Sequence, residues 1–98
     1  MVKVTIKEEN NLIKEIVFEG HCRDGNVCAA VSALSIATIN YIELIEDAIE
    51  STDVNGVLTI KVTKDGQYVE KILRQMLNML NDIKSDYPDD IAIDGALS

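Results

Sequence analysis

Two side chains that could carry out covalent chemistry, His21 and Cys28, lie close together in the first third of the chain. His21 is the only histidine, and Cys22 is the only cysteine besides Cys28. A histidine within hydrogen-bond reach of a thiol can take its proton and later protonate a leaving amine. Gly20 and Gly25 give the intervening loop the freedom to fold His21 back over the thiol. This spacing therefore favours a cysteine nucleophile with a histidine base.

Cys28 also lies where a predicted helix begins. Asp24 or Asn26 could cap that helix through a side-chain oxygen. With Asn26 as the cap, Cys28 occupies the second helical position, where unpaired N–H groups and the helix dipole favour a thiolate. The same N–H groups could hold the oxyanion of an acyl-transfer intermediate.

Three other interpretations of these residues stay open. A cysteine in an apolar helix start is usually a small core residue, and a single loop histidine is usually a surface residue. His21, Cys22 and Cys28 could bind zinc with Asp24 as a fourth ligand, although no further His or Cys exists. Cys22 and Cys28 could instead form a reversible, redox-sensing disulfide.

Hydrophobic periodicity predicts the elements that position these residues. Alternation with a period of two predicts strands, and apolar stripes at helical spacing predict two helices. In the first returning strand, Leu12, Ile16 and Phe18 are expected to point inward. The predicted elements are strands over 2–9 and 12–19, a helix over 27–49, a strand over 57–62, a helix from the turn at 64–66 to Tyr87-Pro88, and a strand over 91–93.

This order, ββαβαβ, predicts an α+β fold. The simplest arrangement is a two-layer sandwich in which two helices cover one face of a mixed four-stranded sheet, within a single domain over 1–98. Residues 51–56 are expected to form a polar turn. The stretch 27–39 is apolar or small on every side, so the second helix, another subunit or both must cover it.

Composition narrows the function classes. Of 98 residues, 47% are hydrophobic and 27% charged, which is typical of a globular protein. The net charge of −8 disfavours nucleic-acid binding and favours a basic partner, and residues 24–60 hold six acids and no base. The N-terminus does not resemble a signal peptide, and the uncharged stretch 26–42 contains enough Asn, Ser and Thr to make a poor membrane span. Because two cysteines are too few for a disulfide framework, a reduced, cytoplasmic protein is expected.

The central segment also resembles a known family. Gly20-His21, a loop, and then Val27-Cys28-Ala29-Ala30-Val31-Ser32 is similar to the Gly-His and Val-Cys-Ala-Ala-x-Ser signature of Prp, the bacterial ribosomal-processing cysteine protease. The likeness extends over nearly the whole chain, through the N-terminal hairpin, the middle strand and the second helix closed by Tyr-Pro.

The resemblance implies a cysteine endopeptidase that removes a short N-terminal extension from a large-subunit ribosomal protein. It places the nucleophile at Cys28, the general base at His21 and a serine that binds or orients groups at Ser32. Gly20 and Asn26 are the expected supporting positions. The resemblance also implies a homodimer, and no cofactor, metal, membrane or direct nucleic-acid contact is expected.

The sequence departs from the family pattern at three points. The loop between His21 and Cys28 is shorter than usual, Gly25 replaces a usual acidic residue, and Cys22 replaces a small residue after the histidine. These changes bear on loop mechanics and substrate choice. The alternative functions are a non-catalytic, ribosome-associated binding module and a redox or zinc protein that uses Cys22 and Cys28.

Overall fold

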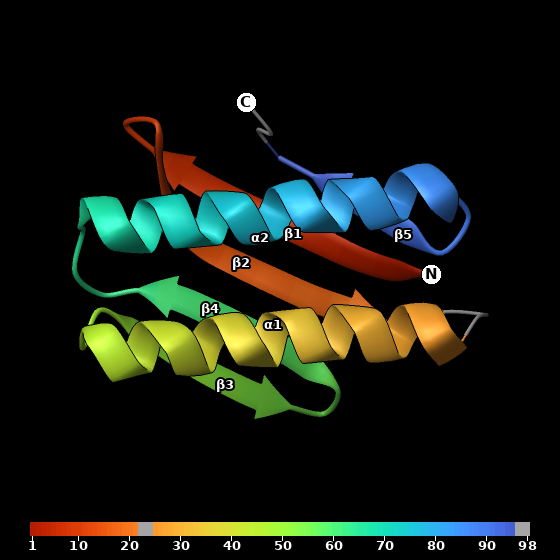
Figure 1. Ribbon diagram of the computed structural model, residues 1–98, viewed down its shortest axis with the longest axis horizontal. Helices are drawn as coiled ribbons and strands as arrows, with labels where there is room; N and C mark the ends of the chain where they lie inside the picture. The colour runs from red at the N-terminus through yellow and green to blue at the C-terminus, as the bar shows by residue number, and fades with distance from the viewer. Residues whose placement is uncertain (22–24, 96–98) are drawn as a thin grey trace.

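The computed structural model describes residues 1–21 and 25–95, which form five strands and two helices. The strands make one mixed sheet in the order β3-β4-β2-β1-β5, and both helices lie on the same face of it (Figure 1). The α+β sandwich is therefore confirmed. The elements are β1 (Val2–Glu9), β2 (Leu12–Gly20), α1 (Gly25–Ile45), β3 (Ile49–Val54), β4 (Val57–Val62), α2 (Gln67–Asp86) and β5 (Ile91–Asp94).

The predicted four-stranded sheet and the order ββαβαβ are wrong, because the segment expected to be a polar turn contains the additional strand β3. The observed order is ββαββαβ, and the first helix ends at Ile45 instead of residue 49. As the edge strand, β3 buries only its first residue, so it lacks the alternation by which the other strands were predicted. Asn55 and Gly56, with φ angles of 53° and 78°, form the two-residue turn that joins it to β4.

The predicted first hairpin is confirmed, with Asn10 and Asn11 at φ angles of 54° and 64° in its turn. Its inward positions differ from the prediction in one respect. The register shifts between Lys7 and Glu8, so Lys14 is an extra residue on β2 and the alternation changes phase there. Ile13 is consequently buried, whereas Leu12, expected to point inward, is only half-buried.

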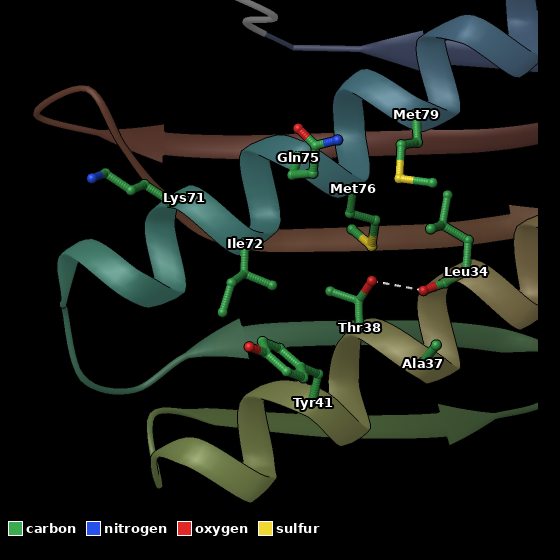
Figure 2. A pocket seen from close by; sticks show the side chains of 9 residues that line it. All are labelled: Leu34, Ala37, Thr38, Tyr41, Lys71, Ile72, Gln75, Met76 and Met79. Carbon is green, nitrogen blue, oxygen red and sulfur yellow. Dashed lines mark hydrogen bonds between the residues drawn. The ribbon is translucent and has the colours of Figure 1, made fainter.

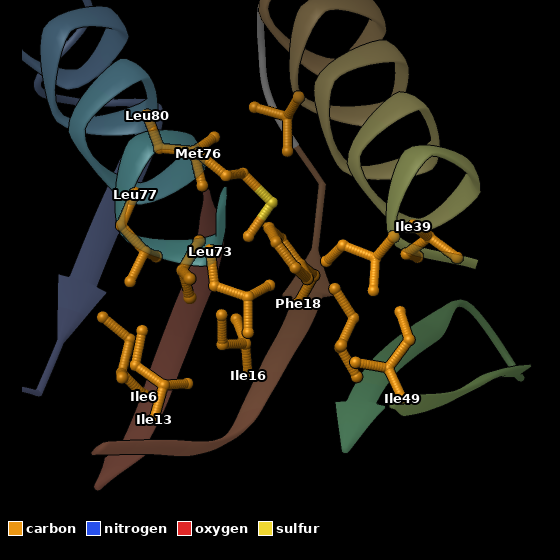
Figure 3. Close-up of a cluster of buried hydrophobic side chains, with 14 of the residues drawn as sticks. Ile6, Ile13, Ile16, Phe18, Ile39, Ile49, Leu73, Met76, Leu77 and Leu80 are labelled. Atoms are coloured by element: carbon orange, nitrogen blue, oxygen red, sulfur yellow. The ribbon is translucent and has the colours of Figure 1, made fainter. Parts of the chain in front are cut away.

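The core lies between the sheet and the two helices. Figure 3 shows Ile16 and Phe18 from β2 facing Leu73 and Leu77 from α2, with Ile39 of α1 on the other side. The predicted stripe of α2 is confirmed as the core-facing side of that helix. Its buried residues are Val69, Leu73, Met76, Leu77 and Leu80, and Ile72 and Ile83 pack partly against them.

The last part of the chain closes the sheet as predicted. The α2 helix ends at Asp86, directly before Tyr87 and Pro88, and β5 then pairs in parallel with β1. Gly95 follows β5, and residues 96–98 lie outside the described part of the chain.

One side of α1 packs on the sheet while the other remains largely apolar and exposed. The helix has the length and composition of one that could cross a membrane, with a mean hydropathy of 1.6, although its Asn, Ser and Thr residues predict a poor span. Core helices of soluble proteins share these properties, but only 28% of this stretch is buried within one chain. The apolar exterior of α1 is therefore an unusual surface feature that calls for an explanation.

Candidate active site

His21 is positioned by the end of β2. Gly20, the last residue of that strand, has a φ angle of +95°, and a Cβ atom there would overlap the backbone carbonyl oxygen of Met1. The Met1 nitrogen donates a hydrogen bond to the carbonyl oxygen of His21. These contacts fix the backbone of His21 against the first strand, and the residue itself remains exposed.

Cys28 is positioned by the first turn of α1. The helix begins at Gly25, which makes Cys28 the fourth helical residue. The prediction of Asn26 as the helix cap is therefore wrong, since Asn26 lies inside the first turn, and the alternative cap, Asp24, lies outside the described residues. Cys28 is half-buried and packs against the core beside Val27 and Val31. Its place in the first turn keeps it within reach of the positive end of the helix dipole.

A cleft of about 320 Å³ brings His21 and Cys28 together. It lies between the first half of α1, the end of β2 and the β3–β4 turn, at the right-hand end of the molecule in Figure 1. Gly20 and Ser32 also line it, and Ser32 follows Cys28 by one helical turn. Four of the five predicted site residues thus share one cavity, and their catalytic roles stay predictions.

Asn26, the fifth predicted site residue, does not line this cleft. It borders a separate cavity of about 280 Å³ between the start of α1 and the end of α2, together with Asp82, Asp86 and Tyr87. Asn26 could therefore support the cleft only indirectly, through the backbone of the first helical turn.

Several residues that line the cleft were not predicted as site residues, among them Glu19, Ser35, Asp53 and Gly56. The Ser35 hydroxyl is buried and donates a hydrogen bond of 3.1 Å to the carbonyl oxygen of Ser32, and helical spacing from Cys28 could have identified it. Asp53 and Gly56 come from the β3–β4 hairpin. The pair Asn55-Gly56 is typical of a two-residue hairpin turn and could have identified this hairpin from the sequence.

The zinc and redox interpretations rest partly on residues that the structure does not describe. Cys22 and Asp24 lie outside the described residues, so a four-ligand zinc site and a Cys22–Cys28 disulfide stay predictions. Within residues 1–21 and 25–95, no three His, Cys, Asp or Glu side chains gather in a metal-binding arrangement.

A larger groove of about 490 Å³ lies between α1 and α2 and shares none of its lining residues with the cleft. Figure 2 shows Tyr41, Ile72 and Met79 among the side chains along it, and the Thr38 hydroxyl, which donates a hydrogen bond of 2.7 Å to the Leu34 carbonyl. Among the described residues that line the groove there is no cysteine or histidine, and Lys71 is the one charged residue. It is therefore suited to an apolar contact and not to the chemistry of His21 and Cys28.

Comparisons with known proteins agree with the cleft's composition. A protein-family model described as cysteine protease Prp matches residues 1–92. Among solved structures, the S. aureus ribosomal processing protease Prp with a covalently linked product peptide has a TM-score of 0.84 and 25% identity, covering 96% of this chain and 98% of that chain. The same enzyme with a substrate peptide has a TM-score of 0.88 and 20% identity, with the same coverage.

A protein from Streptococcus mutans has the same fold, with a TM-score of 0.80 and 20% identity over 96% of this chain and 92% of that chain. Among curated proteins, none matches this chain. The family therefore rests on the match over residues 1–92, and the solved structures agree with it in fold.

Proposed function

Because this chain belongs to the Prp family of cysteine proteases, we propose that it is an endopeptidase that removes the short N-terminal extension of a bacterial large-subunit ribosomal protein. The observation that carries the proposal is the family match together with the cleft that His21 and Cys28 share. Solved structures of the S. aureus ribosomal processing protease with substrate and product peptides support the same substrate class. A protease of ribosomal proteins works in the cytoplasm.

The proposed reaction uses Cys28 as nucleophile and His21 as general base. His21 takes the thiol proton, and the Cys28 sulfur attacks the carbonyl carbon of the scissile bond. Backbone N–H groups at the start of α1 stabilise the oxyanion that forms. His21 then protonates the amine as the C–N bond breaks, and water hydrolyses the thioester to regenerate the thiol.

Ser32 has a supporting role in this proposal. It lies one helical turn beyond Cys28 on the wall of the cleft, and its carbonyl oxygen accepts the hydrogen bond from buried Ser35. Ser32 is thus held at the cleft by helix α1, whose next turn is buried at Ser35. From there it can bind or orient the substrate backbone.

The direct test is cleavage of the organism's own ribosomal protein carrying its extension. The wild-type protein is expected to shorten it at one bond, and Cys28→Ala and Cys28→Ser are expected to bind it without cutting, as mass spectrometry would show. Cys22→Ala should retain cleavage, because Cys22 has no role in the proposed steps. Stable binding by the wild type without cleavage would instead identify a non-catalytic, ribosome-associated module.

We further propose that the chain forms a homodimer through the exposed side of α1 and the groove beside it. Leu44 is 84% exposed and Tyr41 55% exposed, and Tyr41 borders the apolar groove shown in Figure 2. Residues 26–42, which include Tyr41, carry no charge in a chain of net charge −8, and the first acid of the helix, Glu43, comes directly before Leu44. Two copies can therefore approach along this surface without the like-charge repulsion that the rest of the molecule creates.

The dimer is tested by light scattering during size-exclusion chromatography. The wild type is expected to have twice the chain mass of 10.8 kDa. The double variant Leu44→Glu, Tyr41→Glu is expected to have the mass of a single chain. Val54→Glu is the matched control, because Val54 is 61% exposed but lies on the edge strand β3. A monomeric wild type, or a Leu44→Glu, Tyr41→Glu variant that remains dimeric, would contradict the proposed surface.

A further inference from the structure

Asp53 stands out because it occupies an inward-facing position on the edge of the sheet. Directly opposed residues on adjacent strands share one face of a sheet. Val4 lies opposite Phe18, Phe18 opposite Leu58, and Leu58 opposite Asp53. This row is buried and apolar at Val4 and Phe18, half-buried at Leu58, and ends in a carboxylate at β3.

The row ends in the cleft that holds Cys28 and His21. Phe18, Leu58 and Asp53 all line that cavity, so the Asp53 carboxylate borders the same space as the thiol and the imidazole. The lining residues from the described part of the chain include no Lys or Arg. Within the same residues, Asp53 makes no ion pair. Glu19, at the end of β2, is the other acid among the described lining residues. Asp53 differs from it in ending the inward-facing row, on the strand that lies farthest from β1 on that side of the sheet.

We propose that Asp53 is a specificity-determining residue whose carboxylate pairs with a Lys or Arg side chain of the substrate near the cleaved bond. This inference rests on the proposed protease function and adds one named contact to it. A charged donor and a carboxylate form a stronger hydrogen bond than neutral groups do. The apolar row beneath Asp53 would hold the aliphatic stem of the basic side chain, as such stems commonly pack on apolar surface.

A competing explanation is that Asp53 protects an exposed sheet edge. Inward-pointing charges on edge strands prevent two sheets from pairing edge to edge. The two roles differ in what they predict, because edge protection requires no particular residue in a bound peptide.

The test combines variants of Asp53 with a series of peptides that span the extension junction of the organism's ribosomal protein. Each Lys or Arg near the cleaved bond is replaced in turn by Gln. In the wild type, one replacement is expected to lower kcat/KM by about three- to tenfold, because Asp53 is exposed and solvent partly screens its ion pair with the substrate. With the parent peptide, kcat/KM of Asp53→Asn should be lower than that of the wild type by the same factor. Replacing the same basic peptide residue by Gln should then lower kcat/KM of Asp53→Asn no further. Asp53→Lys should prefer the peptide that carries Glu at that position.

The matched control is Glu50→Lys, which makes the same change of charge as Asp53→Lys on the same strand. Glu50 differs in parity from Asp53, so it lies on the sheet face that the helices leave bare. This control should cleave every peptide as the wild type does. An Asp53→Asn variant that lowers kcat/KM equally for all peptides, or for none, would overturn the proposal. Unchanged kinetics with faster aggregation would overturn it in favour of edge protection.

Binding measurements separate this inference from the protease function itself. The same peptides are titrated against Cys28→Ala and against the double variant Cys28→Ala, Asp53→Asn. If Asp53→Asn and the replacement of one basic peptide residue each weaken binding, and the two together weaken it no further, the pairing is supported even if the wild type cuts no peptide. Failure to cut would contradict the proposed protease function alone. Equal affinity of the two proteins for every peptide would overturn the pairing even if the wild type is an active protease.

Discussion

Gly20 connects the sheet to His21 through a backbone conformation that residues with a side chain rarely adopt. Its φ angle of +95° turns the chain away from β2, and the Met1 backbone occupies the space that a Cβ atom would need. His21 follows directly and shares the cleft with Cys28. At the scale of single residues, the position of the proposed base therefore depends on a glycine that carries no chemistry itself.

Replacing Gly20 with Ala should lower both stability and activity. The positive φ angle and the overlap with Met1 are expected to cost about 1–3 kcal/mol, measured as the free energy of unfolding in urea. The value of kcat/KM should fall because the backbone of His21 must shift.

Gly25→Ala is the matched control for this change. Gly25 begins α1, and no atom of a neighbouring residue would meet its Cβ. The control should be neutral or stabilising by up to about 1 kcal/mol. If Gly20→Ala were as stable as Gly25→Ala and kept the wild-type kcat/KM, the strained link would not position His21.

At the scale of elements, the side chain of Arg74 on α2 forms hydrogen bonds with the first hairpin. The Arg74 Nε donates to Glu70 at 2.7 Å, its Nη1 donates to Glu8 at 3.2 Å, and its Nη2 donates to the carbonyl oxygen of Asn11 at 3.2 Å. The backbone N–H of Ile13 donates to the other oxygen of Glu70 at 3.0 Å. The network thus ties the bulged end of β2 to the second helix.

The variant Arg74→Met should destabilise the fold by about 1–3 kcal/mol, because it leaves the half-buried carboxylates of Glu8 and Glu70 without their shared donor. Lys14→Met is the control, since its ion pair with Asp65 is more exposed and should be worth less than about 1 kcal/mol. Equal losses of unfolding free energy in the two variants would contradict this ranking.

The pH dependence of Arg74 follows from the direction of its pKa shift. The hydrogen bond from Arg74 to Glu8, with a further contribution from the bond to Glu70, raises the pKa of the guanidinium above its ordinary value, although desolvation opposes this shift. A group whose pKa is higher in the folded state stabilises the fold fully at any pH below its unfolded-state pKa. That stabilisation is lost only as the pH rises through the folded-state pKa. Titration of Arg74 itself should therefore leave stability unchanged throughout the neutral range.

The whole molecule carries its charge unevenly. Residues 24–60 contain six acids and no base, and this segment includes α1, β3 and the turn beside the cleft. Acids in the C-terminal half of a helix, such as Glu43, oppose the helix dipole, so helix stability does not account for them. We expect these acids to steer a basic segment of the substrate toward Cys28, with surface solubility as their competing role.

Steering predicts that cleavage slows as salt is added. Between roughly 0.05 and 0.5 M NaCl, kcat/KM for a basic junction peptide should fall several-fold while kcat changes little, because screening acts on the approach of the substrate. A peptide of the same length with its basic residues replaced by Gln should show little salt dependence. Equal salt dependence for the two peptides would exclude steering and leave solubility as the role of the charge.

The elements with a clear hydrophobic period could be predicted from the sequence, and those shaped by local backbone geometry could not. The prediction of the apolar stripe on α2 was correct because burial enforces its helical period. The bulge at Lys14 was missed because it has no compositional signature, and β3 was missed because an edge strand needs no buried alternation. His21 and Cys28 followed from sequence spacing and Ser32 from the family resemblance, whereas Asp53 was missed because it reaches the cleft through the unrecognised β3–β4 hairpin.

The measurement that tests the central claim most directly is the intact mass of the protein during turnover of a junction peptide, quenched in acid. If Cys28 is the nucleophile, the wild type should gain the mass of the acyl fragment, and peptide mapping should place the thioester on Cys28. His21→Ala should accumulate this species much more slowly, and Cys28→Ala should not form it. An adduct on Cys22 instead, or full cleavage by Cys28→Ala, would contradict the assignment of Cys28 as the nucleophile.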